Sequence, residues 1–429
     1  MINVLKKSMA TAAACLLLSG VASVRAETAY VFATFKGDAA VDEKLWIYTS
    51  ANGTSFDLLS NTFFAGSTGV LRDPSIMKHT DGKYYIAYTV QSWTTSSTYF
   101  AIASSTNLIN WTQVATVNSG IANTNFTWAP EWFVENGTVR LIVSIAPQGA
   151  DFKPYVYTAT DSSLTNWSSP VDMGIGTNKI DTFVVKTGSV YHAFVKNETT
   201  KYIEHATASN LLGPWTWVGV GNWASWGSGY EAPALAQMEN GQWRLYIDKY
   251  PSSGLWTATS SDLTTWTGLT QVGAYRHGTV LRDTQYTAGH PPSVEYVSNR
   301  NSGKVLDVQN PNQSDGANVG QYTRNNGPWQ QWRFYDTGTG YFTVVSANSG
   351  KCLDVSGAST ADNADIVQWT CNGGTNQQWQ WVAHGSDFLL KARHSGKCAA
   401  VVNSATTDGA DVRQQTCNAA TSQDWVRQP

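Results

Sequence analysis

The chain has 429 residues, of which 42% are hydrophobic, 12% are aromatic and only 14% are charged. Its formal net charge of −3 does not favour nucleic acid or an anionic membrane as a partner. The length is enough for two or three domains.

The N-terminus has the pattern of a secretory signal peptide, because Lys6 and Lys7 precede a short apolar run and Val24 and Ala26 suit signal peptidase. The run is too short to span a membrane, and no later stretch of about 18 apolar residues follows. We therefore expect residues 1–26 to be removed and the protein to be exported, to the periplasm or the extracellular space. Those residues include three basic and no acidic ones, so 25 basic and 31 acidic residues remain, a net charge of −6.

A short phrase recurs roughly every fifty residues over the first 270, each time after a β-rich run. The copies are SANGTSF (50–56), SSTNLINW (104–111), DSSLTNW (161–167), ASNLLGPW (208–215) and SSDLTTW (260–266). This spacing is the length of a four-stranded propeller blade, so five copies predict a five-bladed β-propeller over residues 27–284. The fifth blade must be composite, with 276–283 as its inner strand and 29–35 and 44–50 as outer strands.

A second repeat follows TQYTAGHPPS (284–293), whose Gly and paired Pro mark a break, and we place the linker at residues 285–292. SGKVLDV…WQQW, SGKCLDV…NQQW and SGKCAAV…SQDW end in Q-x-W triplets at Trp332, Trp379 and Trp425. Three such repeats predict a β-trefoil over residues 293–429. The expected fold class is all-β, a propeller followed by a trefoil.

The repeat region contains two pairs of cysteines, each pair nineteen residues apart: Cys352 with Cys371, and Cys398 with Cys417. In an exported protein an even number of evenly spaced cysteines indicates disulfides. A zinc site is the alternative, but no CxxC motif or nearby group of histidines supports it.

Three acidic residues stand at the heads of predicted inner strands. Asp73 begins DPSIM, Asp181 begins DTFVV and Glu231 begins EAPALAQM. Inner strands converge on the propeller axis, so we expect these carboxylates to face one central pit in register. Asp is also common at turns for structural reasons, but three acids from three blades favour acid–base catalysis on a glycosidic bond.

These residues resemble glycoside hydrolase family 43, because RDPSI followed by DGKYYIAYT, ID-x-F and YEAPAL match its three acidic signatures over about residues 28–284. The family contains inverting hydrolases on five-bladed propellers. The resemblance implies that Asp73 is the general base and Glu231 the general acid, and that Asp181 orients Glu231 and raises its pKa. Apolar neighbours would raise that pKa further by desolvation.

Other residues are candidates for contacts with the sugar. Aromatic rings can stack on sugar faces, and Arg72 favours an ionised base if it points inward. Glu131 either hydrogen-bonds a hydroxyl or faces solvent. His277 matches a family position near the axis where some members hold a cation or a water, so a structural cation is an alternative there, although no cofactor is required. The candidates are Arg72, Trp93, Trp128, Glu131, Trp132, Tyr230 and His277.

The C-terminal repeats resemble the ricin-type lectin fold, carbohydrate-binding module family 13, in which a repeat binds sugar through an Asp, an aromatic residue and an Asn-Gln pair. The second repeat matches the whole pattern, with Asp354, Trp369, Asn376 and Gln377. The first repeat keeps the Asp and the aromatic residue of the pattern, as Asp307 and Tyr322. It has Val305 and Arg324 at the positions of the two cysteines, and Trp329 at the position of the Asn. The third has Ala400, Gln415 and Ser422 in the sugar-binding positions, so we expect no sugar there. A purely structural trefoil is the alternative.

Together these features predict a monomeric, inverting exo-glycosidase tethered to a plant cell-wall polysaccharide. The resemblance favours α-L-arabinofuranosyl units as the substrate, then β-xylosides and β-1,3-galactan. A lectin with a silent propeller is the alternative of another class. A retaining fructan-type enzyme would need an Asn-Asp-Pro motif that is absent. Carboxyls separated by about 6.5–9.5 Å would indicate inversion, and about 5–5.5 Å retention.

Overall fold

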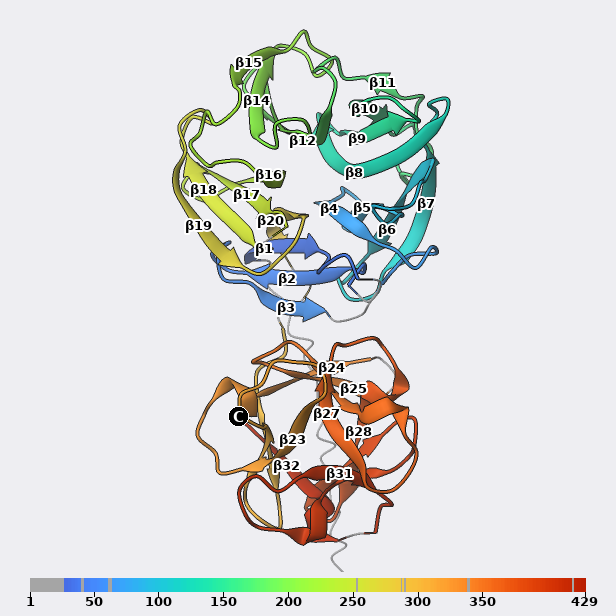
Figure 1. Cartoon of the computed structure of the whole chain (residues 1–429), viewed down its shortest axis with the longest axis vertical. Coiled ribbons are helices and arrows are strands. Elements are labelled where there is room, and N and C mark those ends of the chain that lie inside the picture. Colours follow the sequence, from blue (N-terminus) through green and yellow to red (C-terminus); the bar gives the residue numbers. More distant parts are fainter. Residues whose placement is uncertain are drawn as a thin grey trace, which may run out of the picture.

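The structure is a computed structural model that describes residues 27–39, 42–60, 64–251, 254–286, 288, 291–337, 340–418 and 420–429. The predicted signal peptide lies outside these residues. The described chain forms a five-bladed β-propeller followed by a β-trefoil, which confirms the predicted fold class (Figure 1). Within the described ranges the only helical elements are short 3-10 turns, and no helix has the length and apolarity to cross a membrane.

Each blade is an antiparallel sheet of four strands whose first strand lies nearest the propeller axis (Figure 1). From the inner to the outer strand, blade 1 is β4 (Arg72–Lys78), β5 (Tyr84–Thr89), β6 (Tyr99–Ser105) and β7 (Thr112–Asn118). Blade 2 is β8 (Thr124–Glu135), β9 (Thr138–Pro147), β10 (Lys153–Thr158) and β11 (Val171–Asp172). Blade 3 is β12 (Lys179–Thr187), β13 (Val190–Asn197), β14 (Ile203–Ala208) and β15 (Thr216–Gly219). Blade 4 is β16 (Tyr230–Gln237), β17 (Trp243–Lys249), β18 (Leu255–Ser260) and β19 (Thr267–Gly273).

Blade 5 joins the two ends of the propeller, which confirms the composite blade expected from the sequence. It consists of β20 (Gly278–Tyr286), β1 (Glu27–Thr34), β2 (Trp46–Ser50) and β3 (Asp57–Ser60). The closure is strengthened by Asp283 of β20, a buried carboxylate that accepts hydrogen bonds from Tyr84 Oη at 2.6 Å and Lys78 Nζ at 2.8 Å. Both donors belong to blade 1, so the first and last blades are held together by charge as well as by packing.

The phrase that recurs in the sequence is the turn between the third and fourth strands of a blade. Its leucine has a positive φ, 63° at Leu108 and 64° at Leu263, and the following Trp donates its indole N–H to that leucine's carbonyl. Asn107 and Asp262 accept the free backbone amides of the turn. A side-chain acceptor thus replaces the missing backbone partner in these turns, whereas the first copy, SANGTSF, has Gly53 and Phe56 in place of the leucine and the Trp.

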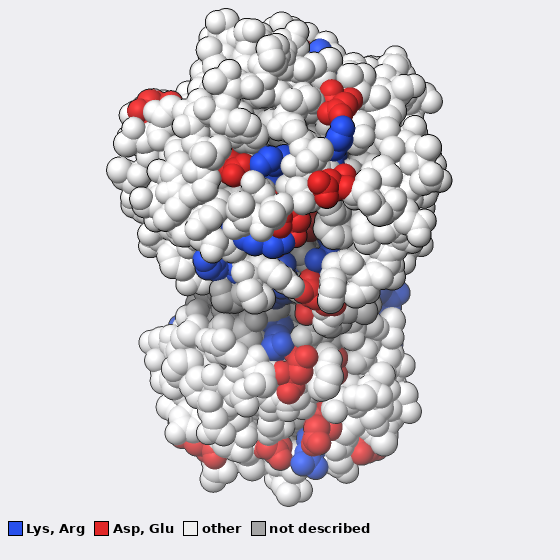
Figure 2. Space-filling model, turned by 45° about the horizontal axis from the view of Figure 1, so that its top comes forward, with Lys and Arg blue, Asp and Glu red and all other residues white. Residues whose placement is uncertain are grey.

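Four of the five inner strands share a β-bulge at the end that reaches the axis. The bulges interrupt the pairing of β4, β8, β12 and β16 with their neighbours, and each contains one left-handed residue. These residues are Asp73, Ala129, Asp181 and Ala232, with φ between 45° and 55°. A bulge bends the strand and re-aims its side chains. Charged residues gather around the hollow centre of the propeller on the face shown in Figure 2.

The sequence predicted that the three acids stand in register on their inner strands, and the bulges show that they do not. Asp73 and Asp181 occupy the same left-handed position, but the residue there in blade 4 is Ala232. Glu231 lies one residue earlier, at the position held by Trp128 in blade 2. The three acids therefore reach the axis from two different positions of the inner strand, because a bulge adds a residue that simple strand alternation does not count.

The trefoil has a core of buried apolar side chains around Trp332, Trp379 and Trp425, one from each Q-x-W triplet. Each indole N–H donates to a backbone carbonyl of its own repeat, at 2.8–3.1 Å. The strands are β21 (Tyr296–Asn299), β22 (Val305–Val308), β23 (Ala317–Tyr322), β24 (Trp332–Asp336), β25 (Phe342–Ser346), β26 (Cys352–Val355), β27 (Ala364–Trp369), β28 (Gln378–His384), β29 (Asp387–Ala392), β30 (Cys398–Val401), β31 (Val412–Gln415) and β32 (Asp424–Gln428). The 3-10 turns are η1 (Pro328–Gln330), η2 (Ser356–Ala358), η3 (Thr375–Gln377), η4 (Val402–Ser404) and η5 (Thr421–Gln423).

A ring of aspartates ties the three repeats together. Asp315 of the first repeat accepts the amide of Thr370 in the second at 2.6 Å. Asp362 of the second likewise accepts from Thr416 of the third, and Asp408 of the third accepts from Thr323 of the first, both at 2.7 Å. These three hydrogen bonds form a closed ring, because each repeat donates one backbone amide to a neighbouring repeat and accepts one amide with its own aspartate.

Both predicted disulfides are present, Cys352–Cys371 and Cys398–Cys417. Disulfides are typical of proteins that fold in an oxidising compartment, whereas export itself stays a prediction. The first repeat, which lacks cysteines, has Arg324 stacked on Tyr296 with 3.6 Å between the guanidinium and the ring centroid.

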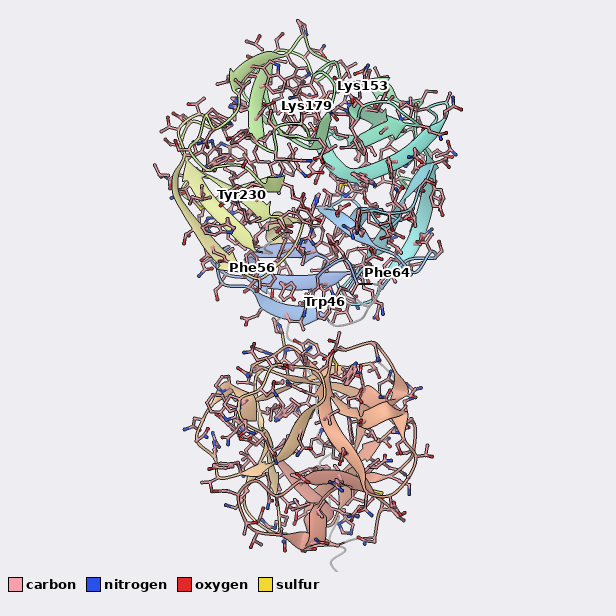
Figure 3. The ribbon with its side chains drawn as sticks, viewed as in Figure 1. Trp46, Phe56, Phe64, Lys153, Lys179 and Tyr230 are labelled. Carbon is pink, nitrogen blue, oxygen red and sulfur yellow. A yellow bond between two sulfur atoms is a disulfide. The ribbon has the colours of Figure 1, made fainter. Side chains whose placement is uncertain are left out.

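The trefoil touches the propeller at the outer strands of blade 5. Tyr335 donates its hydroxyl to the carbonyl of Leu58 at 2.5 Å, and Arg333 lies 3.4 Å from Asp57. Leu58 packs against the apolar cluster that contains the Cys352–Cys371 disulfide. Figure 3 labels Trp46 and Phe56, which lie in the part of the propeller nearest the trefoil.

Candidate active site

A pocket lies at the propeller axis, where the bulged ends of the inner strands meet. Seven residues predicted from the sequence line it: Arg72, Asp73, Trp93, Trp128, Asp181, Glu231 and His277. Asp73, Asp181 and Glu231 come from three blades and are brought together as expected. Seven more line the pocket without having been predicted: Asp38, Thr89, Ile180, Lys196, Glu198, Tyr250 and Arg276.

Asp73 stands on the blade 1 side of the pocket, largely buried. Its Oδ1 lies 3.3 Å from Nδ1 of His277, which immediately precedes the inner strand of blade 5. The other ring nitrogen of His277, Nε2, is buried and has no hydrogen-bond partner among the described residues. The imidazole of His277 is therefore held against the carboxylate of Asp73 by Nδ1, while Nε2 has no hydrogen-bond partner among the described residues.

Asp181 is buried beside Glu231 and contacts its backbone. Its Oδ2 accepts the amide of Ala232 at 3.1 Å, while its own amide donates to Ser144 Oγ at 3.1 Å. Burial raises the pKa of Asp181 to about 6, against the opposing effects of His277 and Lys196. Asp181 thus fixes the peptide that follows Glu231, and its burial favours the protonated form.

Glu231 differs from the sequence prediction in its ionisation. Burial by itself would raise its pKa, but Lys196 Nζ lies 2.8 Å from Oε2 and Arg276 Nη2 lies 3.3 Å from Oε1. With His277 nearby, these positive charges outweigh desolvation and lower the pKa of Glu231. The expected elevation is absent because Lys196 comes from β13 and Arg276 from the segment before β20, so neither could be read from the neighbours of Glu231 in sequence.

The two cations are themselves held in place by further acids. Asp248 is fully buried and accepts from Arg276 Nε at 2.8 Å and from the amide of His277 at 3.1 Å. Burial raises the pKa of Asp248 to about 6 although Arg276 opposes this. Lys196 also pairs with Glu198 at 2.9 Å.

Lys196 and Asp248 occupy the same position on the second strand of their blades, opposite the last residue before the bulge. Thr89 and Ser144 hold that position in blades 1 and 2 and accept bulge amides of the next blade, from Ala129 and Asp181. The available signal in the sequence was a charged residue at the end of an apolar run, as in AFVK and LYID. Burial of such a charge has a large desolvation free energy unless the charge is paired.

Exposed aromatic rings surround the mouth of the pocket. Trp93 is 56% exposed and Tyr250 is 44% exposed. Trp128 packs against Phe126 and Phe152, with ring centroids 5.0 and 4.7 Å away. Rings of this kind offer flat apolar faces for a sugar while the polar groups below offer hydrogen bonds.

Three predicted sugar contacts lie behind the pocket wall and not in it. Glu131 is only 2% exposed, and burial raises its pKa well above the usual value, although a hydrogen bond from Ser75 opposes this. Trp132 is buried and donates its indole N–H to the carbonyl of Ser75, and Tyr230 is buried in the apolar cluster between blades 3 and 4. The bulge turns these side chains toward the packing between blades. Trp223 and Trp226, in the segment before β16, pack on the same cluster.

A structural cation beside His277 stays a prediction. Within the described part of the chain, no three His, Cys, Asp or Glu side chains are placed so that they could hold a metal ion. A hard cation such as calcium needs about six to eight oxygen ligands, and His277 contributes one nitrogen beside one carboxylate. No chemical step is therefore assigned to a metal.

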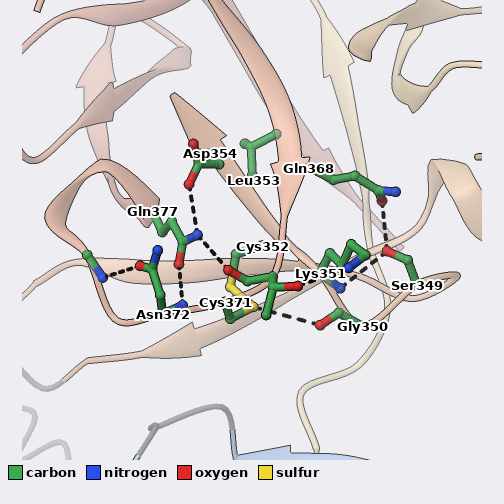
Figure 4. Close-up of a disulfide and its surroundings, with 12 residues drawn as sticks. Ser349, Gly350, Lys351, Cys352, Leu353, Asp354, Gln368, Cys371, Asn372 and Gln377 are labelled. Atoms are coloured by element: carbon green, nitrogen blue, oxygen red, sulfur yellow. Dashed lines mark hydrogen bonds between the residues drawn. A yellow bond between two sulfur atoms is a disulfide. The ribbon is translucent and has the colours of Figure 1, made fainter. Parts of the chain in front are cut away.

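The second trefoil repeat assembles all four predicted sugar-binding residues. Asp354 Oδ2 accepts a hydrogen bond from Gln377 Nε2 at 2.8 Å (Figure 4). The same oxygen accepts from Asn376 Nδ2 at 2.9 Å. Trp369 is 42% exposed on the neighbouring strand. Burial raises the pKa of Asp354 to about 6, against the two amide hydrogen bonds that lower it.

The other two repeats differ from the second. In the first, Asp307 accepts from Gln330 at 2.8 Å and shares a pocket with Tyr322 and Trp329. Trp329 thus adds a ring where the pattern has an amide. In the third, a buried Ala400 takes the place of the acidic residue.

Comparison with known proteins agrees with this division of the chain. The model of a probable glycosyl hydrolase domain, related to glycoside hydrolase family 43, matches residues 26–288. The model of the ricin-type β-trefoil lectin domain matches residues 293–425. An α-L-arabinofuranosidase from Bifidobacterium longum subsp. longum is 25% identical over 213 residues, 40% of this chain and 20% of the relative. The chain therefore spans only about a fifth of that curated relative.

Three solved structures are similar in part or in whole. An exo-β-1,3-galactanase from Clostridium thermocellum is 20% identical, with 94% of this chain and 93% of that chain covered and a TM-score of 0.44. A family 43 β-1,3-galactosidase is 11% identical, with 93% and 88% covered and a TM-score of 0.44. A designed three-fold symmetric protein, ThreeFoil, is 46% identical over 32% of this chain and 98% of its own, with a TM-score of 0.31.

The hydrolase match covers more than half of the chain and contains the whole axial pocket. The chain belongs to the family of probable glycosyl hydrolases related to glycoside hydrolase family 43, and it carries a ricin-type β-trefoil lectin domain.

Proposed function

We propose that the protein is an inverting exo-glycosidase that removes terminal α-L-arabinofuranosyl units from a polysaccharide held by its lectin domain. The observation that carries the proposal is the axial pocket, in which Asp73, Asp181 and Glu231 from three blades meet beneath a rim of exposed aromatic rings. The similarity to an α-L-arabinofuranosidase supports this substrate.

In the proposed reaction Asp73 is the general base that activates water, and Glu231 is the general acid that protonates the leaving oxygen. Asp181 is a positioning residue, because it holds the amide that follows Glu231. The lowered pKa of Glu231 means that its acid form grows as the pH falls. We therefore expect the enzyme to work best on the acidic side of neutrality.

The substrate is tested with p-nitrophenyl α-L-arabinofuranoside, β-D-xyloside and β-D-galactoside, with NMR of the first sugar released. We expect the arabinofuranoside to have the highest kcat/KM and the released arabinose to have the inverted anomeric configuration. Faster hydrolysis of the galactoside or xyloside would contradict the substrate, and release of the retained anomer would contradict the mechanism.

The roles of the two acids are tested with Glu231→Gln and Asp73→Asn. Each variant should lose roughly 10²–10⁴-fold in kcat on natural arabino-oligosaccharides, the usual range for acid–base groups. Glu231→Gln should lose less on substrates with good leaving groups, because these need little protonation. Circular dichroism checks folding, and wild-type rates in a folded variant would refute its assignment.

The ion pair on Glu231 predicts a shift in the pH profile. Lys196 lowers the pKa of Glu231, so Lys196→Met should raise it and keep the acid protonated to higher pH. The alkaline limb of kcat/KM, which reports ionisation in the free enzyme, should move to higher pH. Lys153→Met is the matched control, because Lys153 pairs with Asp172 on the outer part of blade 2. An unmoved limb would show that Glu231 is not the acid.

The lectin site is tested with Asp354→Asn. We expect binding to arabinan or arabinoxylan to weaken about tenfold, the effect of losing a charge-assisted hydrogen bond, with unchanged hydrolysis of small soluble substrates. Because the pKa of Asp354 is about 6, wild-type binding should weaken as the pH falls through that value. Gln415→Ala in the third repeat is the control. Unchanged polymer binding by Asp354→Asn would refute this site, and Asp307→Asn tests the first repeat in the same assay.

A further inference from the structure

A second groove lies where the trefoil meets blade 5, away from both the axial pocket and the lectin sites. Its volume of about 380 Å³ is twice the roughly 190 Å³ of the axial pocket and within the range of small-molecule sites. The propeller contributes Lys36, Phe56 and Tyr275, and the trefoil contributes Tyr335, Asn348 and Ser349.

Lys36 brings a positive charge to this groove. Its ammonium lies 3.7 Å above the ring of Trp46, and no described residue accepts a hydrogen bond from it. Burial first, and then Lys351, lower its pKa to about 8, while Asp42 and Asp315 act in the opposite direction. An ammonium has three donors to satisfy, so the half-buried ammonium of Lys36, which has only a ring beneath it, can receive an anion.

The rest of the groove suits a polar ring that carries that anion. Its aromatic rings provide apolar faces of the kind that sugars stack on. Asn348 Nδ2 is buried without a hydrogen-bond partner, a second donor that lacks an acceptor. Arg333 adds a positive charge, although it is already engaged by Asp57 and the carbonyl of Pro292.

The charge balance of the two cavities is opposite. The lining of the groove contains Lys36 and Arg333 against Asp57. The axial pocket contains five acidic residues against three Lys or Arg. A carboxylate is therefore repelled by the axial pocket and attracted by the groove.

We propose that the groove between blade 5 and the trefoil binds an acidic sugar, with its carboxylate on the ammonium of Lys36 and its ring against the aromatic wall. Such a site would hold acidic branches of a polysaccharide while neutral units are cleaved at the axis. The inference does not depend on which neutral sugar the axial pocket hydrolyses.

The test is isothermal titration of the full chain with methyl β-D-glucuronide, with methyl β-D-glucoside as the neutral counterpart. We expect saturable binding of the glucuronide and at least tenfold weaker binding of the glucoside. Lys36→Met, which keeps an unbranched stem over Trp46, should weaken glucuronide binding at least tenfold, and Lys36→Arg should restore most of it. Glucuronide affinity should also fall as the pH rises through about 8, where the ammonium loses its proton.

Controls separate this site from the others. Lys83→Met, on a hairpin of blade 1 where Lys83 lies 3.9 Å from Asp81, should bind the glucuronide normally. Hydrolysis of neutral p-nitrophenyl glycosides should be unchanged in Lys36→Met, so a failure of the proposed catalytic function would not be mistaken for a failure of this one. The proposal is overturned if glucuronide binding is undetectable, if it survives in folded Lys36→Met, or if inorganic phosphate binds Lys36 as tightly, which would mark a general anion site.

Discussion

The architecture of the axial pocket depends on the bulge that the inner strands make where they reach the propeller axis. A regular strand would turn successive side chains to alternate faces and leave at most one of them directed at the axis. The bulge adds a residue and places Asp73 and Asp181 in the left-handed region, at a cost of about 1–2 kcal/mol each. Asp tolerates this conformation better than most residues, so the acid that the site uses is also one that the backbone accepts.

The second requirement is charge compensation. Carboxylates that are buried together cannot all stay ionised unless cations are placed between them. Lys196 and Arg276 do this for Glu231, and Asp248 orients Arg276 from behind. Because Lys196 comes from blade 3 and Arg276 from the segment that leads into blade 5, the ionisation of Glu231 is a property of the assembled ring of blades and not of one strand.

The trefoil separates its structural residues, which recur in every repeat, from its sugar-binding residues, which vary. Its three buried tryptophans fill one core, and the aspartates that link neighbouring repeats close a circle. This scaffold is the same in all three repeats, so the sugar-binding residues can vary without cost to the fold. The second repeat carries the full set, the first exchanges an amide for Trp329, and the third has Ala400 in place of the acid.

The sequence by itself determined the features that repeat or are local. The spacing of the blade phrases and the Q-x-W triplets predicted both folds, the composite blade 5 and the two disulfides, and the heads of the inner strands identified Asp73, Asp181 and Glu231. Only the tertiary structure decided that Glu131, Trp132 and Tyr230 lie behind the wall, and that Lys196, Arg276 and Asp248 serve Glu231. The reason is physical. Strand periodicity is encoded along the chain, whereas an ion pair forms only between charges within about 4 Å of each other. Residues of different blades come within that distance only when the propeller closes.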